Sequence, residues 1–341
     1  MLRIKKSDLG KLYARIAEKQ ALYLPVKASG KTNFAAWTEG AEVDLCTLKT
    51  VKSPKDAFFP QCETLYTCQK EEGRIALCTQ QRQEEPFVVF GMKACDVRAV
   101  TVLDQVFLAE PVDSYYAARR AHGIIVSLAC SRPETSCFCQ TFGIDCAAPE
   151  GDVATWSAGE YLYWLSQSEK GEKLTASVAD LLEQTDDAAV EEEKNAIKAI
   201  CDRLPLKDLS LEGWGAEAAS KRFDSPLWEE MYKPCLACGT CTFVCPTCQC
   251  YDIKDYDTGN GVQRYRCWDS CMYSDFTMMA HGNNRTSQMQ RFRQRFLHKL
   301  AYFPANNNGL FSCVGCGRCV DKCPSHLNIV KVIKAFGKEG M

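Results

Sequence analysis

Two runs of cysteines near the carboxyl end share one spacing, C-x2-C-x2-C-x3-C, and a proline follows each run directly. The eight cysteines are Cys235, Cys238, Cys241 and Cys245 in the first run and Cys313, Cys316, Cys319 and Cys323 in the second. Thiolates are the ligands that bind iron in iron–sulfur clusters. Three thiolates, each separated from the next by two residues, allow one tight loop to bind three corners of a [4Fe–4S] cluster. Pro246 and Pro324 then turn the fourth cysteine away from its own loop.

This duplicated run is the spacing of two-cluster bacterial ferredoxins, in which the fourth cysteine of each run binds the other run's cluster. We therefore predict two [4Fe–4S] clusters. The ligands of the first are Cys235, Cys238, Cys241 and Cys323, and those of the second are Cys313, Cys316, Cys319 and Cys245. Zinc is the alternative, because all-cysteine zinc sites also use C-x2-C pairs. Such sites usually place the second pair at a distance, so the unbroken run of four favours the clusters.

The segment between the two runs is much longer than a minimal ferredoxin needs. It holds four more cysteines, which are Cys248, Cys250, Cys267 and Cys271. They either bind a further cofactor or are buried thiols beside the clusters, and their spacing matches no cluster motif. A basic stretch, 285–300, lacks Gly and Pro, which permits a helix, and in a helix Arg291 and Arg295 lie one turn apart. Its charge is either a solvated face, a docking surface, or a field that favours the reduced, more negative clusters.

A second group of cysteines lies in the amino-terminal half, around the ends of two predicted strands. The group consists of Cys95, Cys130, Cys137 and Cys139. The apolar runs 86–92 and 123–130 are the predicted strands, and ligands of open α/β sheets bind at the carboxyl ends of strands. The group predicts a third [4Fe–4S] cluster, with a zinc site or buried thiols as alternatives. Cys146 follows closely and is a possible replacement for one ligand.

The elements that position these cysteines indicate an α+β fold. A helix follows the first strand, with apolar residues at helical spacing over 97–106 and with Asp96 as its N-cap. Another helix is predicted over 188–204. We predict a mixed α/β domain over 1–224 and a two-cluster ferredoxin-like domain of helices and loops, with the long insertion, over 225–341. Five cysteines belong to no motif and are expected to be structural: Cys46, Cys62, Cys68, Cys78 and Cys201.

The composition and the absent motifs exclude several classes of protein. The 341 residues include 41 Lys and Arg against 43 Asp and Glu, and this net charge of −2 argues against a nucleic-acid-binding protein. The sequence has no G-x-G-x-x-G, P-loop or G-x-S-x-G motif, so we expect no flavin or nicotinamide to bind to this chain itself. No secretory signal and no apolar run near the ~20 residues of a membrane span are found. We therefore expect a cytoplasmic protein whose 22 cysteines are reduced.

Seven segments together resemble a known family of iron–sulfur subunits. They are FFPQCETL (58–65), MKACDVRAVTVLDQVFL (92–108), DSYYAARR (113–120), VSLACSRPETSCFCQTFG (126–143), CLACGTCTFVCPTCQCYD (235–252), RCWDSCM (266–272) and CVGCGRCVDKCP (313–324). The family includes the beta subunit of soluble sulfhydrogenases and the iron–sulfur subunits of two other enzymes. These are anaerobic sulfite reductase and the flavin oxidoreductases that feed heterodisulfide reductase. The resemblance covers nearly the whole chain and is weaker over about 150–225.

The resemblance implies an electron-transfer subunit of an anaerobic redox complex. Such a subunit relays single electrons between a partner that binds FAD and NAD(P)H and a catalytic subunit of the hydrogenase, sulfite reductase or heterodisulfide reductase type. The resemblance also favours the amino-terminal cluster, although the family's proline near the end of that segment is replaced here by Cys146. Two other interpretations are a self-contained iron–sulfur reductase of a small sulfur compound or disulfide, and a zinc-stabilised interaction or redox-sensing protein.

Overall fold

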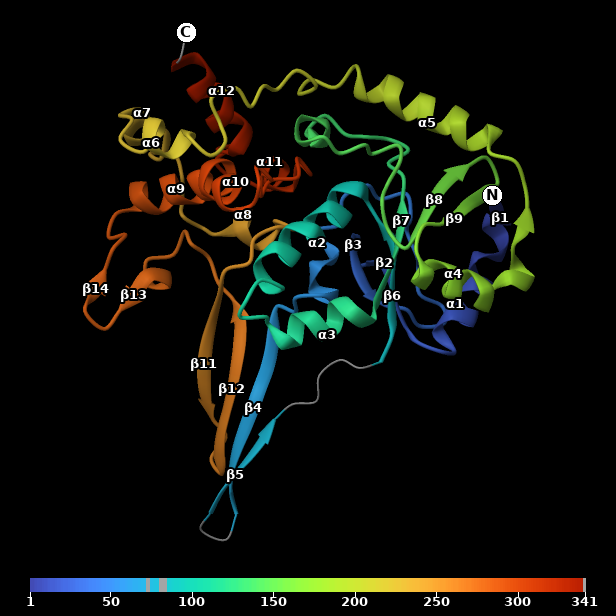
Figure 1. The fold of residues 1–341 in the computed structure, drawn as a ribbon, viewed down its shortest axis with the longest axis horizontal. Coiled ribbons are helices and arrows are strands. Elements are labelled where there is room, and N and C mark those ends of the chain that lie inside the picture. The colour runs from blue at the N-terminus through green and yellow to red at the C-terminus, as the bar shows by residue number, and fades with distance from the viewer. Residues whose placement is uncertain (72–73, 80–84, 340–341) are drawn as a thin grey trace.

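A computed structural model describes residues 1–71, 74–79 and 85–339, and its largest element is an eight-stranded mixed sheet (Figure 1). The strand order is β10-β1-β9-β8-β7-β6-β2-β3. In chain order the strands are β1 (Leu2–Lys5), β2 (Ala21–Ala28), β3 (Lys31–Ala36), β6 (Phe87–Met92), β7 (Gly123–Leu128), β8 (Val153–Ala158), β9 (Tyr161–Ser166) and β10 (Glu183–Gln184). The four central strands β2, β6, β7 and β8 run parallel, and the outer pairs are antiparallel.

The two central strands β6 and β7 are buried along their whole length because helices cover both faces of the sheet. Alternate side chains point to opposite faces of a strand. Val88 of β6 packs with α1 (Leu9–Ala17) and α4 (Glu169–Ser177), whereas Val89 packs with α2 (Ala94–Phe107) and α3 (Ser114–His122). Helix α5 (Ala188–Cys201) covers β8 on the side of α2. This two-sided burial explains why both strands are continuous apolar runs.

A second sheet is built from two distant parts of the chain. Its antiparallel order is β11-β12-β4-β5, with β4 (Cys62–Glu71), β5 (Arg74–Thr79), β11 (Tyr251–Asp257) and β12 (Gly261–Trp268). Figure 1 shows it as an arm that extends away from the larger sheet. The β4 and β12 strands lie on opposite sides of the predicted boundary between 224 and 225, and they are paired directly. The two predicted domains therefore share one sheet, and the boundary itself remains a prediction.

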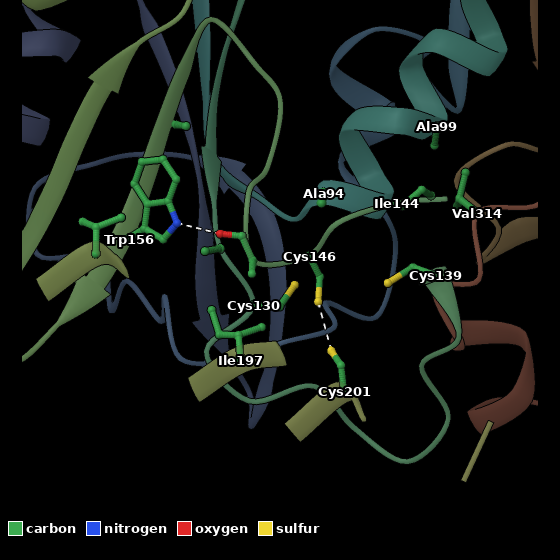
Figure 2. Packing of buried hydrophobic residues seen from close by; sticks show 14 of the residues in the cluster. Ala94, Ala99, Cys130, Cys139, Ile144, Cys146, Trp156, Ile197, Cys201 and Val314 are labelled. Atoms are coloured by element: carbon green, nitrogen blue, oxygen red, sulfur yellow. Dashed lines mark hydrogen bonds between the residues drawn. The ribbon is translucent and has the colours of Figure 1, made fainter. Parts of the chain in front are cut away.

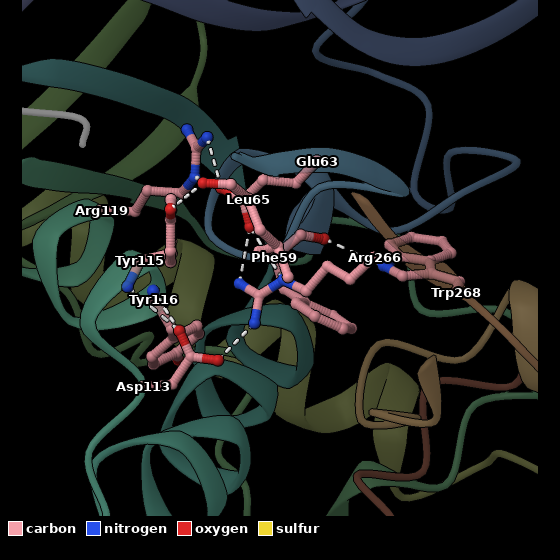
Figure 3. Close-up of polar contacts among 9 residues, drawn as sticks. All are labelled: Phe59, Glu63, Leu65, Asp113, Tyr115, Tyr116, Arg119, Arg266 and Trp268. Carbon is pink, nitrogen blue, oxygen red and sulfur yellow. Dashed lines mark hydrogen bonds and ion pairs between the residues drawn. The ribbon is translucent and has the colours of Figure 1, made fainter. Parts of the chain in front are cut away.

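Buried ion pairs join the base of this second sheet to the amino-terminal helices (Figure 3). Arg266 of β12 pairs with Glu63 of β4, 2.7 Å from Nη2 to Oε2, and also with Asp113 at the start of α3. Glu63 accepts a second bond from Arg119 of α3, 2.8 Å from Nη2 to Oε1. Trp268 donates from its indole nitrogen to the Phe59 carbonyl at 3.1 Å. Because the Arg266 and Glu63 side chains are only 3% and 7% exposed, water does not screen their attraction strongly.

The carboxyl-terminal region consists of short helices around one apolar core. The helices are α6 (Ala218–Arg222), α7 (Leu227–Met231), α8 (Thr240–Phe243), α9 (Gln288–Leu297), α10 (Phe303–Asn306), α11 (Arg318–Asp321) and α12 (Ile329–Glu339). Helix α9 begins with a capping box, since Ser287 accepts from the Gln290 amide and the Gln290 side chain accepts from the Ser287 amide. It continues into a π-helical turn, η6 (His298–Tyr302). Two two-residue strands, β13 (Met278–Met279) and β14 (Gly282–Asn283), pair with each other.

Short 3-10 helices complete the described elements. They are η1 (Lys6–Asp8), η2 (Pro54–Ala57), η3 (Cys139–Phe142), η4 (Ala179–Leu181) and η5 (Asp275–Thr277). No helix in the described part of the chain is long and apolar enough to cross a membrane.

The predicted α+β fold, the two apolar strands and the helix near 188–204 are confirmed, and the stretch 285–300 contains helix α9. The prediction that Asp96 caps its helix is wrong. Helix α2 begins at Ala94 with Lys93 as the N-cap, which places Asp96 inside the first turn. Its carboxylate instead pairs with Arg318, 222 residues away in the sequence.

Candidate iron–sulfur sites

The cysteines predicted to bind the first cluster line one cavity, which we call the outer site. They are Cys235, Cys238, Cys241 and Cys323. Backbone amides point at the sulfur atoms: the Ala237 amide donates to Cys235 Sγ at 3.4 Å and the Leu327 amide donates to Cys323 Sγ at 3.2 Å. Bonds of this kind stabilise thiolates and tune bound clusters. Four thiols around a cavity with amides aimed at the sulfurs fit a [4Fe–4S] cluster.

One side of the outer site is buried, and the other side is exposed to solvent. Cys241 is largely enclosed, and burial raises the pKa of its thiol to about 11. Cys238 is exposed, and hydrogen bonds from the Thr240 hydroxyl and amide lower the pKa of its thiol. The loop glycine, Gly239, has a φ of 72°, and a Cβ there would lie 2.5 Å from the Tyr273 hydroxyl oxygen. The loop therefore needs glycine to pass so close to its neighbour.

The cysteines predicted for the second cluster gather deeper in the molecule, and we call them the inner site. They are Cys245, Cys313, Cys316 and Cys319. Burial, with a smaller contribution from the charge of Cys245, raises the pKa of Cys313 to about 12. Burial and the charge of Cys245 also raise the pKa values of Cys316 and Cys319. The three thiols of the second run are thus electrostatic neighbours of Cys245, the fourth cysteine of the first run. The prediction that each run's fourth cysteine binds the other run's cluster requires this proximity.

The cysteines predicted for the third cluster line a separate cavity, the amino-terminal site, and Figure 2 shows two of them, Cys130 and Cys139. They are Cys95, Cys130, Cys137 and Cys139. Cys95 lies in the first turn of α2, and Cys130 lies two residues beyond the end of β7. Cys139 begins η3. The carboxyl edge of the sheet therefore collects these thiols, as expected for ligand sites in α/β sheets.

Two further cysteines belong to this cavity. Cys146, the possible replacement ligand, has its Sγ 3.3 Å from the Sγ of Cys201 and also contacts Cys130 and Cys139. Figure 2 shows the other three sulfurs around that of Cys146. Cys201 was expected to be structural only, and that expectation missed its place in the cavity wall. Its position at helical spacing after Ile197 on the buried face of α5 was the signal in the sequence.

The amino-terminal and inner sites are adjacent. Cys316 of the inner site lines the amino-terminal cavity together with Gly315 and Arg318. The Phe138 amide donates to the Gly315 carbonyl at 2.9 Å, which ties the cysteine loop of one region to that of the other. Arg318 forms a two-pronged ion pair with Asp96, with N–O distances of 2.6 and 2.8 Å, and both side chains are buried. The two loops are therefore held in a fixed relation.

Three of the four cysteines of the insertion lie beside these sites. Cys248 hydrogen-bonds to Cys245. This hydrogen bond and the nearby Lys299 ammonium lower the pKa of Cys245. Cys271 hydrogen-bonds to Cys250 and lowers the pKa of Cys250 to about 7.

The fourth insertion cysteine, Cys267, lies on β12 opposite Cys62 of β4. In the described part of the chain, no three His, Cys, Asp or Glu side chains are placed to hold one metal ion. A [4Fe–4S] cluster does not need three side chains around one metal ion, because its four ligands bind four separate iron atoms.

Comparisons with known proteins agree with this chemistry. A family model described as a 4Fe-4S dicluster domain matches residues 234–327, a span that contains all eight cysteines of the two runs. The sulfhydrogenase 2 subunit beta of Pyrococcus furiosus is 32% identical over 335 residues, which cover 96% of this chain and 96% of that protein. No solved structure matches the chain. The predicted [4Fe–4S] chemistry is confirmed, and the assignment of each ligand stays a prediction.

Proposed function

We propose, since this chain belongs to the family of sulfhydrogenase beta subunits, that it relays single electrons inside a cytoplasmic redox complex. One neighbour in that complex binds FAD and NAD(P)H, and the other is a catalytic subunit of the hydrogenase, sulfite reductase or heterodisulfide reductase type. The chain contributes three [4Fe–4S] sites, held by the cysteines of the outer, inner and amino-terminal sites. A [4Fe–4S] cluster, when bound, supplies reversible one-electron chemistry.

The observation that carries this proposal is the continuity of the three thiol sets. Cys316, a predicted ligand of the inner site, also lines the amino-terminal cavity. Cys319 of the inner site and Cys241 of the outer site are electrostatic neighbours. The inner site thus neighbours both of the other sites, which supports an electron path through it. The outer site reaches the surface, since Cys238 is exposed and Leu236 is 68% exposed.

The partners follow from what the chain's own residues offer. Buried cysteines and aromatic side chains hold and enclose the sites, but the sequence carries no dinucleotide fingerprint for a flavin or nicotinamide. These groups are therefore assigned to a partner. The 22 free cysteines support a reducing compartment such as the cytoplasm.

Anaerobic purification of the complex tests the proposal. We expect about twelve iron and about twelve sulfide per chain for three clusters. About eight of each would reject the amino-terminal cluster, and bound zinc in a colourless protein would reject the proposal. Mass spectrometry of the co-purifying chains should find a flavoprotein and a catalytic redox subunit. Turnover of a sulfur compound or disulfide by the isolated chain would instead favour a self-contained reductase.

Replacement of one inner ligand tests the relay itself. Cys316→Ala should lower the iron content by about four atoms per chain and reduce electron transfer to the catalytic subunit. Reduction of the partner flavin by NAD(P)H should be unchanged, since that step precedes the relay. The matched control is Cys78→Ala on the exposed part of β5, which should keep both the iron and the transfer. Loss of flavin reduction in the Cys316 variant would contradict the proposed order.

A further inference from the structure

Two buried cations lie on one face of the helix that packs against the cysteine loops. Arg295 near the end of α9 is 3% exposed, and Lys299, one turn later in η6, is 4% exposed. Two of the other buried cations, Arg266 and Arg318, each pair with a carboxylate. Arg295 and Lys299 form no ion pair with any carboxylate in the described part of the chain. Their charges therefore need another counter-charge inside the protein.

The groups around Arg295 are thiols of two sites. Arg295 lines the outer cavity beside Cys241. Cys319, an inner-site cysteine, is another electrostatic neighbour of the guanidinium. Its Nε atom is buried without a hydrogen-bond partner. The guanidinium thus lies between the outer and inner sites with an unused donor.

The ammonium of Lys299 is fixed beside the inner site. Its Nζ donates to the Thr247 hydroxyl at 2.8 Å and to the Ser312 carbonyl at 3.1 Å, and both are neutral groups. The Thr247 hydroxyl also hydrogen-bonds to the Cys245 sulfur at 3.2 Å, so the ammonium lies beside a cysteine of the inner site.

We propose that Arg295 and Lys299 are positioning residues whose charges favour the reduced, more negative form of the clusters. Arg295 acts on both the outer and inner clusters, and Lys299 acts on the inner one. The proposal rests on the proposed function, since it requires the clusters to be bound. A fixed positive charge in a water-poor interior raises the reduction potential of a nearby cluster. The carboxylate partners of Arg266 and Arg318 cancel this effect at those two cations.

The test is a redox titration of the full-length chain with its clusters, followed by EPR and visible absorbance. Lys299→Met should lower the reduction equilibrium constant of the inner cluster at least tenfold, a shift of 59 mV for one electron, and change the outer cluster less. Arg295→Gln should lower both. The charge-keeping variants Lys299→Arg and Arg295→Lys should recover most of the shift. Arg293→Gln removes the same charge from the half-buried outer part of α9 and should change neither cluster.

The outcomes separate this proposal from the function. Full iron content with unchanged potentials in Arg295→Gln and Lys299→Met overturns the tuning role and leaves the relay intact. A wild-type chain without clusters rejects the function instead. If Lys299→Met fails to hold the inner cluster, the reduction potential of the outer cluster in Arg295→Gln tests the proposal. A lowered potential supports it, and an unchanged potential overturns it. Cluster loss in both neutral variants, with retention in the charge-keeping ones, assigns the cations to assembly and overturns the proposal.

Discussion

The buried pair of Asp96 and Arg318 is the contact that most directly joins the amino-terminal helices to a cysteine loop. Asp96→Asn keeps the side-chain shape but leaves the Arg318 charge uncompensated inside the protein. Breaking a buried pair from one side costs about 3–5 kcal/mol of folding free energy. We expect that loss in chemical denaturation of the variant.

The control for this prediction is a solvent-exposed pair on α4. Lys173 and Glu169 are 75% and 80% exposed, so Lys173→Ala should change stability by less than about 1 kcal/mol. Equal, small losses in both variants would show that Arg318 finds another partner.

Among single residues, the sequence predicted the grouping of the two cysteine runs well and the role of Asp96 poorly. Ligand spacing is a local property, because the loop that binds a cluster is itself local. The N-cap expectation for Asp96 also used only neighbours in sequence. Its real partner, Arg318, is brought in by the fold, and no local pattern contains that information.

Among the elements, the loop that begins the second cysteine run has the tightest contact with the rest of the protein. Gly315 has a φ of 61°, and a Cβ there would lie 2.4 Å from the Phe138 carbonyl oxygen. Gly315→Ala must therefore push the Phe138 loop away from the inner site. We expect a stability loss clearly above the ~1–2 kcal/mol of a left-handed alanine, together with lower iron content.

A second glycine isolates the backbone part of that loss. Gly309 has a φ of 80°, and no atom lies within 4 Å of the position its Cβ would take. Gly309→Ala should therefore cost only the ~1–2 kcal/mol of the left-handed conformation and keep all the iron. Identical behaviour of the two variants would mean that the Phe138 contact does not constrain the loop.

Strands β6 and β7 could be predicted, whereas β4, β5, β11 and β12 could not. The first two are continuous apolar runs because both of their faces are covered. Strands β5 and β11 are largely exposed, as Ile75 and Tyr256 illustrate with 80% and 61% exposure, and β4 and β12 are mostly half-buried. Their stability comes from pairing between distant segments, which leaves a weak periodic signal in each segment alone.

For the whole molecule, the shared sheet predicts that the two halves of the chain unfold together. Arg266→Met removes the charge that links β12 to β4 and α3, and leaves Asp113 without its partner. We expect a loss of about 3–5 kcal/mol. Tryptophan fluorescence and cluster absorbance should fall in one coincident transition, because tryptophans lie in both halves.

The control on the same strand is Arg264→Met. Arg264 pairs with Asp255 at 41% and 48% exposure, so its loss should cost less than about 1 kcal/mol. Two separate transitions in either variant would show that the halves are independent domains and would support the boundary near 224.

The pairing of β4 with β12 also sets an order in time. Glu63 and Arg266 are 203 residues apart, and a ribosome adds roughly 5–20 residues per second. Strand β4 is therefore made about 10–40 s before the strand that completes its sheet. During that interval the nascent chain presents an unpaired strand edge, a surface that chaperones cover and that other chains can join. The time needed to synthesise the chain between β4 and β12 is thus a time during which the growing protein exposes this edge to other chains.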